Sequence, residues 1–150
     1  MIAVIQRVTS SSVAVDGGIV GKIGPGFNVL LGIADSDTDE DLQWVAKKIL
    51  GMRVFSDHEG KMNLDLKDID GNILLISQFT LLANTKKGNR PSFIEAARPE
   101  KAVPLYEKMI AILSEGLGKP VEKGIFGADM KVSIENDGPV TIVIDSQQKR

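Results

Sequence analysis

Residues 27–33 read Phe-Asn-Val-Leu-Leu-Gly-Ile. This run is mostly apolar, follows a Gly-Pro-Gly turn at 24–26, and has the length of an ordinary strand. Successive side chains of a strand point to opposite faces, so an apolar run of this kind is buried on both faces. It therefore predicts a central strand with protein packed on both sides.

Two amphipathic helices are predicted further along the chain. The first follows capping residues at 35–40 and ends at Gly51. The second covers about 100–116, and Pro104 either kinks its first turn or marks its true start. Each has an apolar face, which is formed by Leu42, Val45, Ala46, Ile49 and Leu50 in the first and by Tyr106, Ile110, Leu113 and Leu117 in the second.

Strands outnumber helices. Besides the central strand, the pattern predicts strands at 2–8, 11–15, 19–23, 52–57, 73–82, 130–135 and 140–145. Asn136-Asp137-Gly138-Pro139 is typical of a turn, so these residues are expected to form a turn between the last two strands. No linker or internal repeat divides the chain, which predicts one α+β domain over residues 1–150 with about five loose residues at its end. The sheets are expected to be mostly antiparallel or mixed.

Composition narrows the class of protein. With 150 residues and 43% hydrophobic content, the chain can bury a real core. It has no run long enough to span a bilayer and no secretory leader pattern, so we expect a cytoplasmic protein without a membrane partner. Cysteine is absent and histidine occurs once, which excludes thiolate and multi-histidine metal sites. A net charge of −2 argues against broad charge-driven binding of DNA or RNA, though a local RNA contact stays open.

The segment Ser77-Gln78-Phe79-Thr80 places polar side chains at the end of a buried strand. An unpaired buried polar group costs about 1–3 kcal/mol, so each of these groups needs a partner or a purpose. Either their hydroxyls satisfy neighbouring backbone groups at a strand end, or the segment forms a pocket wall that offers backbone N–H groups.

Two further features bear on function. Lys86, Lys87 and Arg90 follow that segment and form either a solvated loop or a site for phosphate groups of a larger substrate. His58, the single histidine, falls in a turn expected to be exposed, where it is badly placed to act as the base of a catalytic triad.

Several segments together resemble one family. The whole chain, from residue 1 to about 145, is similar to D-aminoacyl-tRNA deacylases, formerly called D-tyrosyl-tRNA deacylases. The most specific pair of motifs is Ser-Gln-Phe-Thr at 77–80 with Gly-Pro-Val-Thr at 138–141, and a small departure is Gly127, where the family leads us to expect alanine. The matching segments are 5–8, 55–57, 61–63, 77–81, 90–93, 126–130 and 136–141.

The resemblance implies a fold, an activity and partners. The fold is a compact α+β domain whose sheets form a barrel-like core with two main helices. The activity is hydrolysis of the ester between a D-amino acid and the 3′ end of tRNA, including glycine mischarged on non-cognate tRNA. The partners are aminoacyl-tRNA and a second copy of the chain, with active sites at the dimer interface. No metal or organic cofactor is implied.

For catalysis we expect Ser77, Gln78, Phe79 and Thr80 to form the site. The backbone N–H groups of Phe79 and Thr80 are the natural donors to a developing oxyanion. Thr80 is either a nucleophile, which needs an adjacent base, or a positioning residue beside an attacking water assisted by the substrate's ribose 2′-hydroxyl. The second reading is favoured because no base is evident.

For substrate binding, the resemblance points to six residues. Phe126, with Phe79, is expected to pack against the adenine or form the pocket wall, and Met130 is either an apolar contact for the adenine or a core residue. Gly138 and Pro139, through a peptide bond that is cheap to place in cis, are expected to present carbonyl oxygens to the partner subunit's pocket and exclude L side chains. Arg7 with Gln6 is expected to orient that dipeptide.

Two competing classes remain open. One is a non-catalytic RNA-binding or dimeric interaction module, which the acidic charge disfavours. The other is a general small-molecule esterase, which lacks a credible base beside Ser77 or Thr80.

Overall fold

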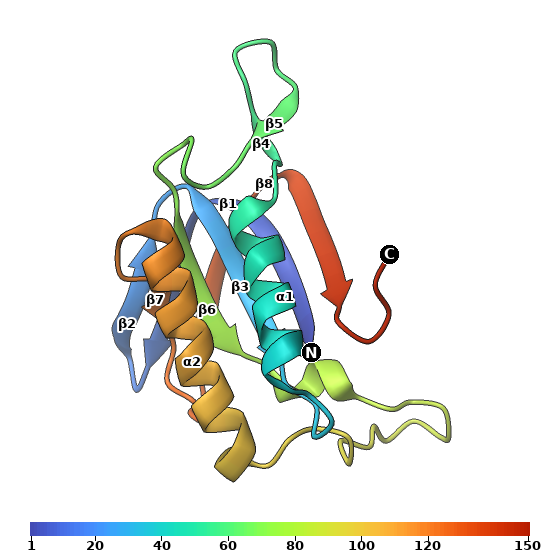
Figure 1. Cartoon of the computed structure of the whole chain (residues 1–150). Helices are drawn as coiled ribbons and strands as arrows, with labels where there is room; N and C mark the ends of the chain where they lie inside the picture. The colour runs from blue at the N-terminus through green and yellow to red at the C-terminus, as the bar shows by residue number, and fades with distance from the viewer.

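The sheet is built around β1 (Ile2–Val15), which uses both of its edges (Figure 1). One edge pairs antiparallel with β3 (Gly26–Gly32) in its first half and with β2 (Gly18–Ile23) in its second half. The other edge pairs antiparallel with β8 (Lys131–Asp145) along almost its whole length. The computed structural model describes all 150 residues.

The chain leaves β3 and returns parallel to it. It passes through α1 (Asp39–Gly51) and a small hairpin of β4 (Phe55–Ser56) and β5 (Met62–Leu64), and re-enters the sheet as β6 (Asn72–Ser77). β6 pairs with β3 in parallel from Gly26↔Asn72 to Leu31↔Ser77. The predicted central strand is thus confirmed, with all but one of its residues buried.

A second parallel connection follows. A single 3-10 turn, η1 (Phe79–Leu82), leads through a long loop into α2 (Pro99–Leu117) and then to β7 (Glu122–Lys123), which pairs parallel with β6. The sheet order is therefore β2-β1-β3-β6-β7, with β8 paired to the other edge of β1. No helix is both long and apolar enough to cross a bilayer.

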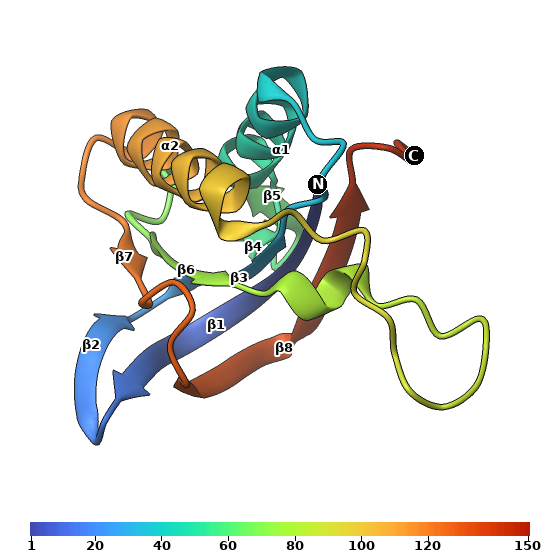
Figure 2. The same ribbon diagram turned by 90° about the horizontal axis from the view of Figure 1, so that it is seen from below.

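Both helices cover the same face of the sheet (Figure 2). A cluster of 21 buried residues fills the space between the helices and the sheet, including Phe27, Leu42, Leu75 and Met109. On the other face the sheet curls over a second cluster, and β8 closes that side. This second cluster consists of Val8, Val13, Ile23, Leu74 and Ile76. The result is the expected α+β fold, with two helices and a nearly closed, barrel-like mixed sheet.

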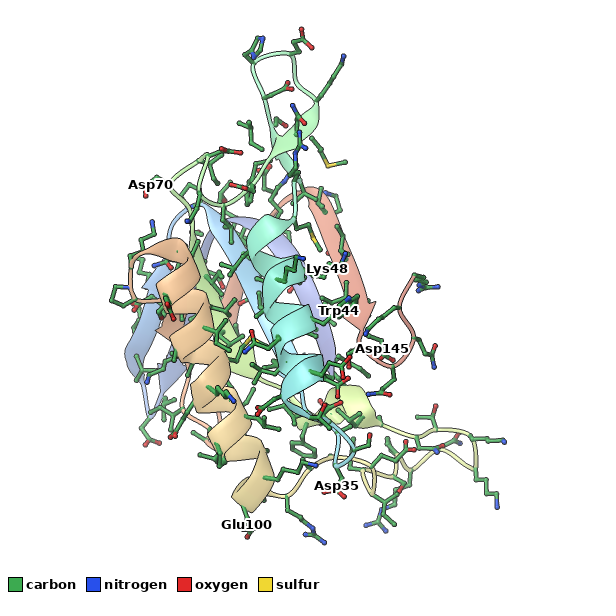
Figure 3. The ribbon with its side chains drawn as sticks, in the orientation of Figure 1. Asp35, Trp44, Lys48, Asp70, Glu100 and Asp145 are labelled. Carbon is green, nitrogen blue, oxygen red and sulfur yellow. The ribbon has the colours of Figure 1, made fainter.

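The two ends of the chain meet beside α1. The Met1 ammonium donates to the Asp37 carboxylate at 2.5 Å and to the Ser146 hydroxyl at 2.8 Å, with Met1 and Asp37 fully buried. The Ser146 N–H donates back to the Met1 carbonyl, so the first residue of the expected loose tail is held in place. Trp44 of α1 shares a surface hollow with the end of β8 at Asp145 (Figure 3).

The turn predicted between two separate strands at 136–139 is wrong. Residues on both sides of the turn sequence pair antiparallel with β1 in one continuous ladder, from Ala14↔Lys131 to Ile2↔Asp145. Between Gln6↔Thr141 and Val8↔Asn136, Arg7 alone stands opposite residues 137–140. The turn chemistry therefore produces a bulge inside one strand, because both flanking segments find their partner in β1 rather than in each other.

Four other details also differ from the prediction. The segments 2–8 and 11–15 form one strand, and the strand expected at 52–57 shrinks to Phe55–Ser56. The strand expected at 73–82 stops at Ser77, after which residues 79–82 coil into η1. Pro104 lies inside α2 rather than at its start, where Pro99 occupies the first turn.

Candidate functional site

A pocket of about 270 Å³ lies where β6 ends. Its floor comes from the ends of β3 and β6, and its walls come from η1, from the approach to α2 and from the segment before β8. Five of the predicted site residues line it: Ser77, Gln78, Phe79, Phe126 and Met130. The other lining residues are Leu31, Ile33, Ile76, Ala97, Ala102, Gly127, Ala128, Asp129 and Val132.

The change from strand to 3-10 turn exposes two backbone donors. The Gln78 N–H continues the ladder by donating to the Leu31 carbonyl at 2.7 Å. The first hydrogen bond of the turn then runs from the Leu81 N–H to the Gln78 carbonyl at 3.2 Å. The N–H groups of Phe79 and Thr80 precede that bond, so they have no acceptor within the turn. Both residues are exposed, and no other hydrogen bond of the loops and turns uses either N–H.

Thr80 itself is partnered by an amide. The Gln78 side-chain amide donates to the Thr80 hydroxyl oxygen, and no carboxylate or histidine hydrogen-bonds to that hydroxyl. His58 lies in the turn between β4 and β5, which projects from the end of the molecule opposite η1 (Figure 1). His58 is therefore badly placed to act as a general base for Thr80.

Phe126 is held against the core by Tyr106 of α2. The two ring centroids are 5.8 Å apart, and the Tyr106 hydroxyl donates to the Leu75 carbonyl of β6 at 2.9 Å. Burial raises the pKa of Tyr106 to about 12. A neutral, hydrogen-bonded phenol therefore supports the pocket wall across the physiological pH range.

Met130 is placed by a glycine that the sequence reasoning did not single out. A Cβ on Gly124 would stand 2.5 Å from the Met130 sulfur and 3.2 Å from the Ile76 Cδ1. The missing side chain lets Met130 pack close to β6, where it forms one side of the pocket. Asp129, the one charged residue in the lining, was also missed, since no spacing in the sequence distinguishes it.

Four predicted site residues lie apart from this pocket. Arg7 donates from Nε to the Asp137 carbonyl at 3.0 Å and from a terminal guanidinium nitrogen to the Val54 carbonyl at 2.6 Å. It thereby fixes one end of the bulge that contains Gly138 and Pro139, whose peptide bond is cis. Both residues are exposed, and neither lines the pocket of their own chain.

Gln6 supports the same region from the neighbouring rung. It pairs with Thr141 on one edge and with Asn28 on the other, and its side-chain carbonyl accepts from the Asn28 amide at 3.4 Å. Asn28 is fully buried in the central strand. The Gln6–Asn28 contact thus links β1, beside the bulge, to the buried central strand.

The chain is similar to known proteins over nearly its full length. The family model for D-Tyr-tRNA(Tyr) deacylase matches residues 4–145. A protein of Flavobacterium psychrophilum named D-aminoacyl-tRNA deacylase is 56% identical over 149 residues, which cover 99% of each chain. A protein of the same name from Sulfurihydrogenibium sp. is 58% identical over 148 residues, again 99% of each chain.

Two solved structures have a similar fold. One, described as c-Myc DNA Unwinding Element Binding Protein, superposes with a TM-score of 0.91 at 43% identity and covers 97% of this chain and 98% of its own. The other, described as a probable eukaryotic D-amino acid tRNA deacylase, gives a TM-score of 0.82 at 19% identity, with 95% and 97% coverage, and so bears on the fold alone. Together with the full-length family match and the pocket built by its motifs, these similarities show that the chain belongs to the D-Tyr-tRNA(Tyr) deacylase family of enzymes.

Proposed function

We propose that the protein hydrolyses the ester bond of D-aminoacyl-tRNA and of glycyl-tRNA mischarged on non-cognate tRNA. The products are the free amino acid and tRNA with a free 3′ end. The proposed place of action is the cytoplasm. The observation that carries the proposal is the pair of open backbone donors at Phe79 and Thr80 beside a pocket lined by Phe126 and Met130.

The chemistry requires little beyond positioning, because an aminoacyl ester is already activated. In the proposed reaction the carbonyl oxygen accepts from the Phe79 and Thr80 N–H groups, and water attacks the carbonyl carbon. The tetrahedral intermediate then releases the ribose 3′-oxygen, which takes a proton, while the acyl carbon keeps the water oxygen as a carboxylate. Donors placed in advance for a developing oxyanion stabilise the transition state more than the ground state.

Water is the proposed nucleophile, assisted by the substrate's own 2′-hydroxyl. Thr80 then acts as a positioning residue, held by the Gln78 amide. Phe126 and Met130 offer an aromatic face and a polarisable side chain on which the terminal adenine would pack. Ser77, half-buried at the end of β6, supplies the remaining hydroxyl of the wall.

Chirality is proposed to come from a second copy of the chain. β8 pairs only with β1, so the other edge of β8 has no partner. The exposed Val143 also belongs to β8. Exposed strand edges are ready surfaces for another chain. In the proposed homodimer, Gly138 and Pro139 of one subunit reach the pocket of the other and occupy the place where an L side chain would point. Exclusion of this kind accepts many D side chains and glycine.

The proposal is tested by deacylation of matched D-, L- and glycyl-tRNA by the purified protein. We expect rapid release from D-tyrosyl- and glycyl-tRNA and protection of L-tyrosyl-tRNA. Similar rates on the D and L forms would overturn the exclusion mechanism. A simple p-nitrophenyl ester hydrolysed as fast as the aminoacyl-tRNA would instead identify a general esterase.

A variant of Arg7 supplies a sharper test of the proposed chiral gate, which is the exclusion of L side chains by Gly138 and Pro139. Hydrogen bonds to charged groups contribute about 1.5–3 kcal/mol, so Arg7→Ala should lower the D-over-L rate ratio by about tenfold or more. Lys119→Ala is the matched control, since Lys119 also donates to a backbone carbonyl, that of Asp70 at 3.0 Å, and forms no hydrogen bond with the bulge or with Val54. Equal effects of the two variants would show that Arg7 has no specific role in excluding L side chains.

One solved relative is described as a DNA-binding protein, which raises a second function for comparison. Binding of duplex DNA, measured beside hydrolysis of aminoacyl-tRNA at the same salt concentration, separates the two. DNA binding without any deacylation would favour a non-catalytic module.

A further inference from the structure

The loop that follows η1 carries a local positive charge. Residues 84–92, called here the basic loop, contain Lys86, Lys87 and Arg90 and no acidic residue, in a chain whose net charge is −2. All three side chains are exposed, and none of them forms an ion pair. The three charges are therefore free to meet an anion.

Hydrogen bonds close the base of the basic loop. The Asn84 N–H donates to the Ser92 carbonyl at 2.8 Å, and the Ser92 N–H donates to the Asn84 carbonyl at 3.0 Å. The Asn84 side chain also accepts from the Lys86 N–H at 3.0 Å. These bonds frame a hollow of about 310 Å³ without any apolar lining residue, formed by Asn84, Lys86, Lys87, Arg90 and Ser92. A polar, cationic hollow suits a phosphate better than an apolar ligand.

The basic loop is joined at both ends to the candidate active site. It begins just after Ala83, whose N–H donates to the Thr80 carbonyl at 3.1 Å. It ends before Phe93, whose ring meets the Phe79 ring edge to face at 5.2 Å. Phe79 lines the pocket and is 56% exposed, so an open aromatic surface lies between the pocket and the basic loop. The loop itself projects beside η1 into solvent (Figures 2 and 3).

We propose that the basic loop binds backbone phosphates of the RNA strand whose 3′ end enters the pocket. The inference rests on the proposed function and assigns to this loop the recognition of the nucleic acid rather than of the amino acid. A single-stranded end is well served by cations that follow its backbone together with aromatic rings on which bases stack. Because the rest of the chain has no net positive charge, these three cations would supply much of the salt-dependent affinity.

The test compares two substrates that share one ester. D-Tyrosyl-tRNA carries phosphates, whereas D-tyrosyl-adenosine has the same reacting group and none. The variant is Lys86→Ala/Lys87→Ala/Arg90→Ala, and its control is Lys47→Ala/Lys61→Ala/Lys67→Ala, which removes three exposed cations elsewhere. Equilibrium binding of uncharged tRNA adds a readout that does not depend on hydrolysis.

We expect the loop variant to lose about tenfold or more in kcat/KM on D-tyrosyl-tRNA near physiological salt, with kcat unchanged. Its rate on D-tyrosyl-adenosine should equal that of the unaltered protein. The slope of log binding constant against log salt should become shallower by about two, since each single-strand phosphate contact contributes about 0.7. The control triple variant should match the unaltered protein in each assay.

Two results would overturn the proposal. Equal losses on both substrates would mean that the loop only shapes the pocket, and equal tRNA binding by the loop and control variants would mean that it contacts no phosphate. If the unaltered protein hydrolyses neither substrate, the proposed function fails on its own, and the binding of uncharged tRNA still decides the role of the basic loop.

Discussion

The side-chain amide of Gln78 donates a hydrogen bond to the hydroxyl of Thr80, across the start of η1. This bond leaves the Thr80 proton available, but no carboxylate or histidine accepts it, and a nucleophilic hydroxyl needs such a base. The geometry therefore favours a positioning role for Thr80.

Thr80→Ala separates positioning from nucleophilic attack. It removes the hydroxyl but keeps the backbone N–H, so the expected loss in single-turnover rate is about tenfold or less, the equivalent of one ordinary hydrogen bond. Thr80→Ser should restore most of the rate. A loss of about 10⁴ or more, with substrate binding retained, would instead identify Thr80 as the nucleophile.

Phe79→Pro tests the oxyanion donor directly. Proline lacks the N–H, is tolerated at the first position of a helical turn, and follows Gln78, whose backbone is outside the helical region at φ −143° and ψ 77°. Phe79→Ala is the control, because it also loses the ring but keeps the N–H. We expect kcat of the proline variant to be about 10²–10³ below that of the alanine variant. Equal rates for the two would exclude the Phe79 N–H as a donor in the transition state.

Tyr106 makes stability depend on alkaline pH. Burial raises its pKa to about 12 in the folded protein, whereas an unfolded tyrosine ionises near about 10. Between these values the unfolded chain has lost the proton and the folded one keeps it, so the free energy of unfolding falls by about 3 kcal/mol as pH rises from about 10 to about 12. Below about pH 10 this contribution is fully present.

The titration of Tyr106 can be followed without ambiguity because the chain has one tyrosine. Absorbance near 295 nm should show a midpoint close to pH 12 in the folded protein. Tyr106→Phe should abolish that signal and flatten the alkaline loss of stability. A midpoint near the ordinary tyrosine value would contradict the buried, hydrogen-bonded phenol.

Asp37 is predicted to be a major contributor to stability. Its carboxylate accepts from the buried Met1 ammonium and from the Ala34 N–H at 2.7 Å. Asp37→Asn leaves a buried charge without its counter-ion, which costs about 3–5 kcal/mol. Asp39→Asn breaks an exposed pair with Lys108 and should cost about 1 kcal/mol or less. Urea unfolding at neutral pH compares the two, and similar losses would contradict the buried pair.

Local patterns predicted the elements whose burial is set by their own side chains. The apolar run at 27–33 became the central strand, and the helix whose apolar face begins at Leu42 buries that residue with Val45, Ala46 and Ile49. The type of such an element follows from which of its side chains are buried, and the spacing of apolar residues in the sequence shows which side chains those are. The pocket residues, by contrast, were found through their motifs, since no periodicity marks a pocket.

The errors in the predicted fold share a physical cause. Asn136-Asp137-Gly138-Pro139 has the composition of a tight turn, but the ladder with β1 carries the strand through it. The apolar residues after Gln78 continue a strand pattern, although the chain coils there into η1. Residues 35–40 were recognised as capping residues, but their sequence did not show that Asp37 meets Met1. In each case the local pattern alone did not determine the structure, and for the bulge and for Asp37 the deciding partner is distant in sequence.

The pairing of β1 with β8 also bears on how the molecule is made. Ile2 pairs with Asp145, so one edge of the first strand stays open until the last strand has been synthesised. The pocket wall at 126–132 emerges equally late. During translation the ribosome therefore carries a chain with an exposed strand edge and an incomplete pocket, and contacts this distant in sequence form slowly. Until its last strand has been synthesised, the enzyme lacks a complete pocket, and its unpaired strand edge needs protection from aggregation.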